Sequence, residues 1–300
     1  MADAQTWLQV ICQTTKKHHQ AIEDAMEESG ALSITWNDAY DTPVLEPLPG
    51  EQLLWNDMVI TALFESECDL SQLETLLNKN KSSWDIQDFH IETLEDQDWE
   101  RVWMKDFHPI QFGEKLWIYP SNYDIPTDNP DGHTYIHLDP GLAFGTGTHP
   151  TTALCLEWLD QNPCIDLSAV DYGCGSGILA VAAIKLGATH INATDIDPQA
   201  LIATKDNMLR NDIAAEKISC YLPDDCPQKE HDLVLANILC GPLIELFPTI
   251  ASLTRSGGKL VLSGLLEEQQ SDLIETYSAL FTDFEIKTLD GWIRISATKI

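Results

Sequence analysis

The most constraining stretch of the chain is a glycine-rich turn between a strand-like and a helix-like segment. Residues 170–177 read V-D-Y-G-C-G-S-G, and the helix-like stretch 178–186 follows directly. A second apolar run then ends at Asp195, within T-D-I-D. This order predicts a mononucleotide-binding βαβ unit, because glycines let the backbone approach a ligand and turn sharply into a helix.

The spacing of these glycines distinguishes between two kinds of cofactor. A dinucleotide fold has the spacing G-x-G-x-x-G, whereas Gly173, Gly175 and Gly177 are arranged as G-x-G-x-G. The shorter spacing, after a strand that carries Asp171, resembles the first motif of S-adenosylmethionine-dependent methyltransferases. Asp195 then stands where a carboxylate accepts hydrogen bonds from both ribose hydroxyls of an adenosine. A turn that binds no ligand is the alternative, which the strand-end acid disfavours.

Length and composition point to an intracellular protein of two domains. A chain of 300 residues exceeds the usual size of one domain. No apolar run approaches the roughly 20 residues that span a bilayer, and the N-terminus lacks a secretory pattern. None of the eight cysteines forms a C-x-x-C pair or a zinc-like Cys/His spacing. We therefore expect a cytoplasmic protein with reduced cysteines, without a metal and without membrane contact; a reactive Cys174 has little support.

The chain is strongly acidic, with 48 acidic and 17 basic residues and a net charge of −31. Nonspecific nucleic-acid binding relies on Lys and Arg that neutralise phosphates, so this charge disfavours a direct nucleic-acid partner. A basic protein partner is favoured instead. Solubility, or adaptation to a salty or cold habitat, is an equally weighted alternative, since the excess acid is spread along the chain.

The first hundred residues predict a small domain of their own. Strand-like and helix-like segments alternate there in the order β-α-β-β-α-β, which is typical of a ferredoxin-like α+β fold. A Pro-rich break at 42–50 separates two similar halves. The expected strands are 6–13, 31–36, 58–64 and 84–94, and the expected helices are 17–28 and 70–77. We assign residues 1–95 to this domain.

A short linker helix is expected at residues 96–108. Its sequence alternates aromatic and charged residues at helical spacing, and His108-Pro109 ends it. The apolar stripe of this helix is predicted to pack between domains; it comprises Trp99, Val102, Trp103 and Phe107.

Residues 109–300 read as an α/β domain. After two strands at 115–120 and 134–138, strands and helices alternate, which predicts a doubly wound parallel sheet with one added antiparallel strand. Seven strands in this arrangement indicate a Rossmann-like class I methyltransferase domain. Its expected strands are 169–172, 190–194, 217–221, 233–236, 259–263, 284–287 and 293–299, and its expected helices are 178–186, 198–211, 242–253 and 267–279.

Two further motifs flank the glycine turn. Residues 138–152 read L-D-P-G-L-A-F-G-T-G-T-H-P-T-T, which is a poor core segment and is more typical of a ligand-binding loop than of a structural omega loop. Thr152 begins a helix whose positive end favours an anionic group. Residues 236–243 read A-N-I-L-C-G-P-L at the carboxyl end of the fourth parallel strand. Asn237 occupies the place where amino-group methyltransferases carry an Asp/Asn/Ser-Pro-Pro-aromatic motif, and this resemblance implies that its amide oxygen accepts from a substrate N–H. The alternative is that Asn237 caps the helix after Pro242.

Taken together, these motifs resemble the PrmA family, the methyltransferases of large-subunit ribosomal protein eleven. The segments I-T-W-N-D, V-L-E-P-L-P-G and D-W-E-R-V-W-M extend the resemblance to the whole chain. The resemblance implies that S-adenosyl-L-methionine methylates lysine and N-terminal amino groups of that protein, and that the N-terminal domain recognises it. It also implies cofactor contacts at Thr152, Gly173, Asp195 and Asn237, with Gly175 and Gly177 completing the turn. We expect a monomer.

The implied reaction is in-line transfer of a methyl group to an amine. A lysine side chain has a pKa of about 10.4 and must first lose a proton. The sequence identifies no strong base, so placement of the amine by Asn237 carries most of the expected catalysis. His149 is a candidate proton relay, although a role in structuring the loop is favoured. One rival function is methylation of another protein amine, of a glutamine or of a nucleobase. The others are a nicotinamide dehydrogenase and a binding module without activity.

Overall fold

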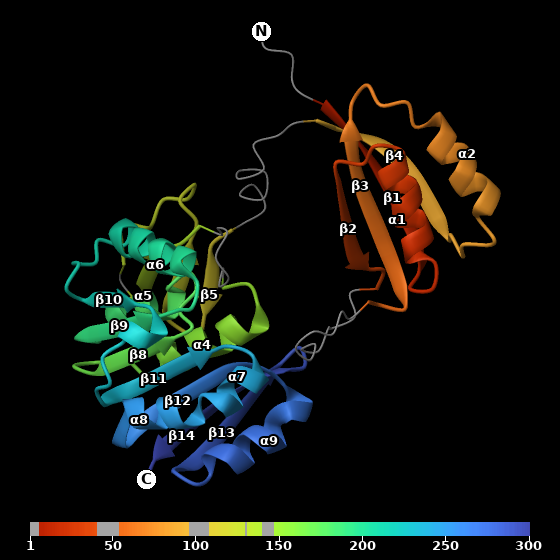
Figure 1. The fold of residues 1–300 in the computed structure, drawn as a ribbon. Helices are drawn as coiled ribbons and strands as arrows, with labels where there is room; N and C mark the ends of the chain where they lie inside the picture. Colours follow the sequence, from red (N-terminus) through yellow and green to blue (C-terminus); the bar gives the residue numbers. More distant parts are fainter. Residues whose placement is uncertain (1–5, 41–53, 96–107, 130, 140–146) are drawn as a thin grey trace. The chain divides into compact units, whose positions relative to one another are not determined.

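The structure is a computed structural model that describes residues 6–40, 54–95, 108–129, 131–139 and 147–300. The chain forms two compact units, Met1–Trp99 and Glu100–Ile300 (Figure 1). Nearly all of the expected linker helix, including its aromatic stripe, lies outside the described residues, as does the Pro-rich break.

The first unit is a four-stranded antiparallel sheet with two helices, as predicted. Its strands lie in the order β2-β3-β1-β4, and each neighbouring pair is antiparallel. The elements follow the chain as β1 (Thr6–Thr15), α1 (His19–Glu28), β2 (Ser33–Asp38), β3 (Asp57–Glu65), α2 (Ser71–Asn80) and β4 (Asp88–Glu95). The ferredoxin-like order β-α-β-β-α-β is therefore confirmed.

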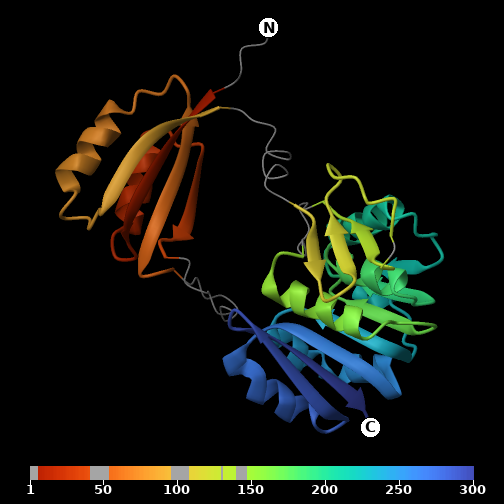
Figure 2. The same cartoon turned by 180° about the vertical axis from the view of Figure 1, so that it is seen from behind.

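Both helices of this unit lie on one face of the sheet (Figures 1 and 2). Val10 and Phe64 are buried on that face, together with Ile22 of α1 and Leu73 of α2. Because side chains alternate along a strand, the intervening residues form the opposite face, which we call the open face. On β1 the open face carries Trp7, Gln9, Ile11, Gln13 and Thr15, all partly exposed.

Strand β4 begins at Asp88, four residues later than residue 84, where the sequence predicts its start. The intervening segment turns, because Asp85 has a left-handed backbone with φ of 48°. The carbonyl of Trp84 accepts a hydrogen bond from the Thr14 hydroxyl at 2.7 Å instead of a strand partner.

The second unit contains a seven-stranded mixed sheet in the order β10-β9-β8-β11-β12-β14-β13. The pairs from β10 to β12 are parallel, and β14 is antiparallel to both of its neighbours. The strands are β8 (Ser168–Tyr172), β9 (His190–Thr194), β10 (Ile218–Tyr221), β11 (His231–Asn237), β12 (Thr254–Leu266), β13 (Phe281–Leu289) and β14 (Trp292–Lys299). This is the class I methyltransferase arrangement that the sequence predicts.

Helices cover both faces of this sheet. One apolar core joins α4, α5 and α6 to the sheet, and a second core joins α7, α8 and α9 to its other face. The helices are α4 (Pro150–Gln161), α5 (Ile178–Lys185), α6 (Pro198–Arg210), α7 (Cys240–Glu245), α8 (Phe247–Leu253) and α9 (Gln270–Tyr277), with short 3-10 turns η2 (Pro223–Asp225) and η3 (Glu267–Gln269). None of the described helices is both long and apolar enough to cross a bilayer.

The direction of winding reverses between β8 and β11. The chain moves outward from β8 through β9 to β10, and then returns to place β11 on the other side of β8. Loops from the carboxyl ends of β8 and β11 therefore leave toward opposite faces of the sheet. In open α/β sheets this switch point is where a crevice forms and ligands bind.

The single helix expected at 242–253 is instead two helices, α7 and α8, which meet at Leu246. The physical reason is Pro248 in the first turn of α8. Proline lacks the N–H that would continue the hydrogen-bond ladder of the preceding helix.

A small third sheet precedes the large one. It comprises β5 (Ile110–Phe112), β6 (Leu116–Tyr119) and β7 (Thr134–His137), in the order β5-β6-β7. The sequence predicts β6 and β7, but β5 is too short for its periodicity to be recognised. Phe112, Leu116, Ile118 and Ile136 are buried against the core that contains α4 and α5.

Candidate active site

A cavity of about 550 Å³ opens at the carboxyl ends of β8, β9 and β11, at the switch point of the sheet. Five of the six predicted site residues line it together, although they are far apart in the sequence: Thr152, Gly173, Gly175, Asp195 and Asn237. The sixth, Gly177, is not among the lining residues. The described residues contain no group of three or more His, Cys, Asp or Glu side chains placed to hold a metal ion.

The glycine turn requires glycine for two different reasons. Gly173 and Gly177 both have left-handed backbones, with φ of 79° and 76°. A Cβ atom on Gly173 would lie 2.2 Å from Ile238 Cγ2 in the cavity wall. Gly177 is the N-cap residue of α5, and a Cβ atom on it would lie 2.6 Å from Thr204 Cγ2 of α6. Gly173 therefore shapes the cavity, whereas Gly177 permits close packing of α5 against α6.

The carboxylate of Asp195 connects the end of β9 to the glycine turn. Its Oδ2 accepts from the Gly175 N–H at 2.9 Å, and its Oδ1 accepts from the Asp197 N–H at 2.9 Å. Since a carboxylate has about four lone-pair sites, each oxygen retains one acceptor position. The adjacent carbonyl of Thr194 accepts from the N–H groups of Gly173 and Cys174 at 2.7 and 3.0 Å.

Asn237 presents a buried acceptor to the cavity. Its Nδ2 donates to Thr152 Oγ1 at 3.2 Å, which leaves Oδ1 oriented away from that contact. Oδ1 is buried and has no hydrogen-bond partner in the described structure. Because an unpartnered buried acceptor is costly, this oxygen is a candidate acceptor for an N–H donor. The capping alternative is not observed, since Leu239 occupies the N-cap position of α7.

His149 has a structural role at the start of α4. It is the N-cap residue, and its Nδ1 accepts from the Thr151 N–H at 3.3 Å and contacts the Thr151 hydroxyl at 2.7 Å. Its ring packs edge-on against Trp292 with centroids 4.8 Å apart. Partial burial lowers the pKa of the imidazole, which favours its neutral form. These contacts match the loop-structuring role favoured by the sequence.

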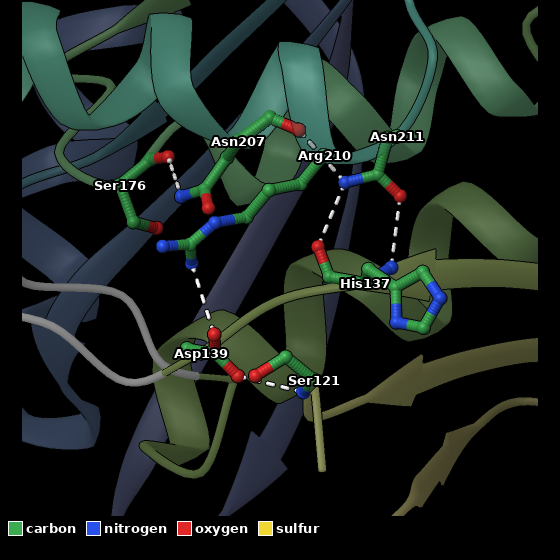
Figure 3. A network of polar contacts seen from close by, with 7 residues as sticks. All are labelled: Ser121, His137, Asp139, Ser176, Asn207, Arg210 and Asn211. Carbon is green, nitrogen blue, oxygen red and sulfur yellow. Dashed lines mark hydrogen bonds and ion pairs between the residues drawn. The ribbon is translucent and has the colours of Figure 1, made fainter. Parts of the chain in front are cut away.

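Two asparagines four residues apart, one on α6 and one at its C-terminal cap, connect the glycine turn to the small sheet (Figure 3). Asn207 Nδ2 donates to the Ser176 carbonyl at 2.8 Å, inside the turn. Asn211, which directly follows α6, binds the backbone of His137 twice, donating to its carbonyl at 2.7 Å and accepting from its N–H at 2.8 Å. Sequence reasoning missed this pair; its only signal is two buried asparagines at helical spacing.

An ion pair reinforces the same connection (Figure 3). Arg210 Nη1 lies 3.1 Å from Asp139 Oδ2, and Asp139 Oδ1 accepts from the Ser121 N–H at 2.7 Å. Asp139 is the last described residue before the 140–146 segment of the second motif, which lies outside the described residues. Helix α6 thus holds both the glycine turn and the residues that lead into that motif.

Asp171 is a buried carboxyl directly behind the glycine turn. Only 1% of its surface is exposed. Its Oδ2 accepts from the Ala180 N–H at 3.0 Å, while its Oδ1 is buried without a partner. Burial raises its pKa to about 7; the bond from Ala180 opposes this rise and the charge of Asp195 adds to it. This group therefore titrates near neutral pH.

The eight cysteines are free thiols. Cys174, within the glycine turn, is buried, and burial raises the pKa of its thiol. The Thr204 hydroxyl lies 3.4 Å from its sulfur. A thiol in this environment is a poor nucleophile, because the thiolate is the reactive form.

Comparison with known proteins identifies close relatives over nearly the whole chain. The family described as ribosomal protein L11 methyltransferase (PrmA) matches residues 6–300. The ribosomal protein L11 methyltransferases of Alteromonas mediterranea and Escherichia coli O8 are 48% and 47% identical, each covering 98% of this chain and 99% of the relative. The crystal structure of a ribosomal protein L11 methylase from Lactobacillus delbrueckii subsp. bulgaricus is 32% identical with a TM-score of 0.58, covering 64% of this chain and 99% of that chain.

The titration of Asp171 predicts a pH-dependent stability. The folded protein holds this proton up to about pH 7, whereas an unfolded carboxyl with a pKa of 3.8 releases it earlier, so stability falls as pH rises between these values. Asp171→Asn removes this effect. We expect its unfolding free energy, measured by urea denaturation, to rise relative to the native protein from about pH 5 to pH 7, by at most about 3 kcal/mol.

The matched control is Asp206→Asn on the exposed face of α6. The difference in unfolding free energy between Asp206→Asn and the native protein should not change across the same pH range. If the difference in unfolding free energy between Asp171→Asn and the native protein also stays constant with pH, the Asp171 carboxyl is already ionised in the folded protein at these pH values.

Proposed function

The chain belongs to the ribosomal protein L11 methyltransferase (PrmA) family, and on this premise we propose that it methylates ribosomal protein L11 at lysine side chains and at the N-terminal amino group. The observation that carries this proposal is the buried, unpartnered Oδ1 of Asn237, a residue that lines the same cavity as Asp195. One group is suited to orient an amine, and the other is suited to bind a ribose.

The cavity fits S-adenosyl-L-methionine, the cofactor of this family. Its volume of about 550 Å³ lies within the range of small-molecule sites, roughly 300–1,000 Å³. The two remaining acceptor positions of Asp195 suit a pair of ribose hydroxyls. Gly173 leaves backbone exposed where a methionyl group needs close approach, and the N-terminus of α4 at Thr152 favours a carboxylate. When bound, the cofactor supplies a methyl group on a sulfonium sulfur.

The residues around Asn237 prepare an amine for reaction. The wall contains the apolar side chains of Ile238 and Trp292. An apolar surrounding lowers the pKa of an amine and favours the neutral form, which alone has a lone pair to react. Asn237 Oδ1 accepts one N–H and fixes the direction of that lone pair, while Thr152 holds the amide in place.

The open face of the first unit is suited to dock the basic substrate. No lysine or arginine occurs in any of its four strands. Glu92 pairs with Gln9, Asp88 with Gln13, and Glu65 with Trp7, which places all three acids on the open face. An acidic surface of this kind raises the association rate of a basic partner. We therefore assign substrate recognition to this unit.

The proposed function is tested by incubating the full chain with S-adenosyl-L-methionine and unmethylated ribosomal protein L11, followed by intact-mass analysis. We expect the mass of L11 to rise in steps of one methylene group. Peptide mapping should place these steps on lysines and on the N-terminus. An unchanged L11, with methylation of another protein amine or of a glutamine in a cell extract, would favour the rival substrate.

Substitution of Asn237 tests the orientation of the amine. Asn237→Ala removes the acceptor while leaving the cavity walls in place, so we expect kcat for L11 methylation to fall by about 100-fold. The affinity for S-adenosylhomocysteine should change much less. Asn162→Ala, at the far end of α4, is the matched control and should retain full activity. Native kcat in Asn237→Ala would rule out this role.

Substitution of Asp195 tests the ribose contact. Asp195→Ala removes the acceptors for both hydroxyls, and we expect it to weaken S-adenosylhomocysteine binding by about 2–3 kcal/mol in calorimetry. Asp197→Ala is the matched control, because Asp197 caps α6 by accepting from the Gln199 N–H and does not line the cavity. Equal affinities of Asp195→Ala and the native protein would refute the contact.

Charge reversal tests the docking surface. The double variant Asp88→Lys and Glu92→Lys places two cations on the open face, and we expect the KM for L11 to rise by about tenfold. The KM for S-adenosyl-L-methionine should not change. The double variant Glu27→Lys and Glu28→Lys makes the same change of charge at the exposed end of α1. If both double variants raise the KM equally, the effect belongs to overall charge and not to the open face.

A further inference from the structure

Four aromatic rings form a closed square on the small third sheet. Figure 2 shows the strands of this sheet in yellow. Trp117 and Tyr119 are on β6, Tyr135 is on β7, and His133 directly precedes β7. Ring centroids along the four sides are 6.1 Å for Trp117–Tyr119, 5.5 Å for Tyr119–Tyr135, 6.0 Å for Tyr135–His133 and 6.3 Å for His133–Trp117. We call this group the aromatic square.

The aromatic square faces away from the core. Leu116, Ile118 and Ile136, which alternate with its residues along β6 and β7, are fully buried. Each ring of the square remains partly exposed. Its members do not line the cofactor cavity and are not among the buried residues of the core beneath the sheet. The square is therefore available for contact with another molecule.

The surroundings of the square are acidic. Residues 116–139 contain four aspartates and neither lysine nor arginine, and the exposed Lys115 directly before β6 is the one neighbouring lysine in the sequence. Asp128 and Asp131 lie close enough to the Tyr135 phenol to raise its pKa, after the larger effects of reduced solvation and of Tyr119. Asp139 is engaged with Arg210 on α6. Aromatic faces beside carboxylates attract cations, and lysine and arginine side chains bind to such faces.

We propose that the aromatic square binds a lysine or arginine side chain of the protein substrate by cation–π contact, at a site separate from the cofactor cavity. The identity of that substrate as ribosomal protein L11 rests on the function proposed above. The square and the open face of the first unit would then each engage a basic segment of the substrate. Contacts on both units limit the orientations in which a lysine is presented to Asn237, since each contact restrains a different part of the substrate.

The test measures the KM for L11 in full-length variants of the square. Trp117→Leu removes the largest ring, and we expect the KM for L11 to rise about three- to tenfold. The kcat and the affinity for S-adenosylhomocysteine should remain unchanged. Trp117→Phe keeps an aromatic face and should restore most of the affinity. Tyr123→Leu removes a partly exposed ring that pairs with His108, outside the square, and is the matched control.

A second measurement separates this proposal from the proposed function. A lysine-rich peptide with free lysine side chains is titrated into the native chain and into Trp117→Leu. We expect the Kd of the variant for this peptide to be about three- to tenfold higher. This result would support the site even if L11 is not the substrate. An unchanged KM and unchanged peptide binding in Trp117→Leu would overturn it. Lowered thermal stability with no change in either binding measurement would show that the square serves packing alone.

Discussion

The hydrogen bonds between the glycine turn and the end of β9 are the interactions on which the site depends. Asp195 accepts the Gly175 N–H, and the carbonyl of Thr194 accepts the N–H groups of Gly173 and Cys174. These bonds hold a left-handed backbone that is strained for most residues. They also place the Asp195 carboxylate at the cavity and leave acceptor positions on it. One set of contacts therefore fixes both the shape and the polarity of the pocket.

Two of the buried oxygens without hydrogen-bond partners lie at or behind the glycine turn and the neighbouring strand end. Asp171 Oδ1 lies behind the glycine turn, and Asn237 Oδ1 lies at the end of the neighbouring strand β11, on the other side of the switch point. Each reduces the stability of the chain alone, because a buried polar atom without a partner is unfavourable. A ligand that reaches Asn237 would complete the hydrogen bonding there, whereas Asp171 does not line the cavity. Binding at Asn237 would therefore also stabilise the folded chain.

The surfaces of both units carry acidic side chains that suit a basic partner. The strands of the first unit and residues 116–139 of the second unit lack lysine and arginine altogether. Both surfaces suit a basic partner, and the open face and the aromatic square offer it different contacts, through carboxylates and through ring faces. Long-range charge attracts a basic partner with little dependence on orientation, whereas a ring face binds a cation only at short range.

The sequence by itself determined the order of elements, the glycine turn and the candidates Asp195 and Asn237, because local patterns of glycine, apolar residues and strand-end acids report local structure. It also predicted the ferredoxin-like unit, although not the turn at Asp85 or the break before Pro248. Only the tertiary structure decided which partner each polar atom finds. Those partners are distant in sequence. Thr152 accepts from Asn237, and Asn207 and Asn211 donate to the backbone of the glycine turn and of His137. Long-range pairing of this kind depends on packing, which no local pattern records.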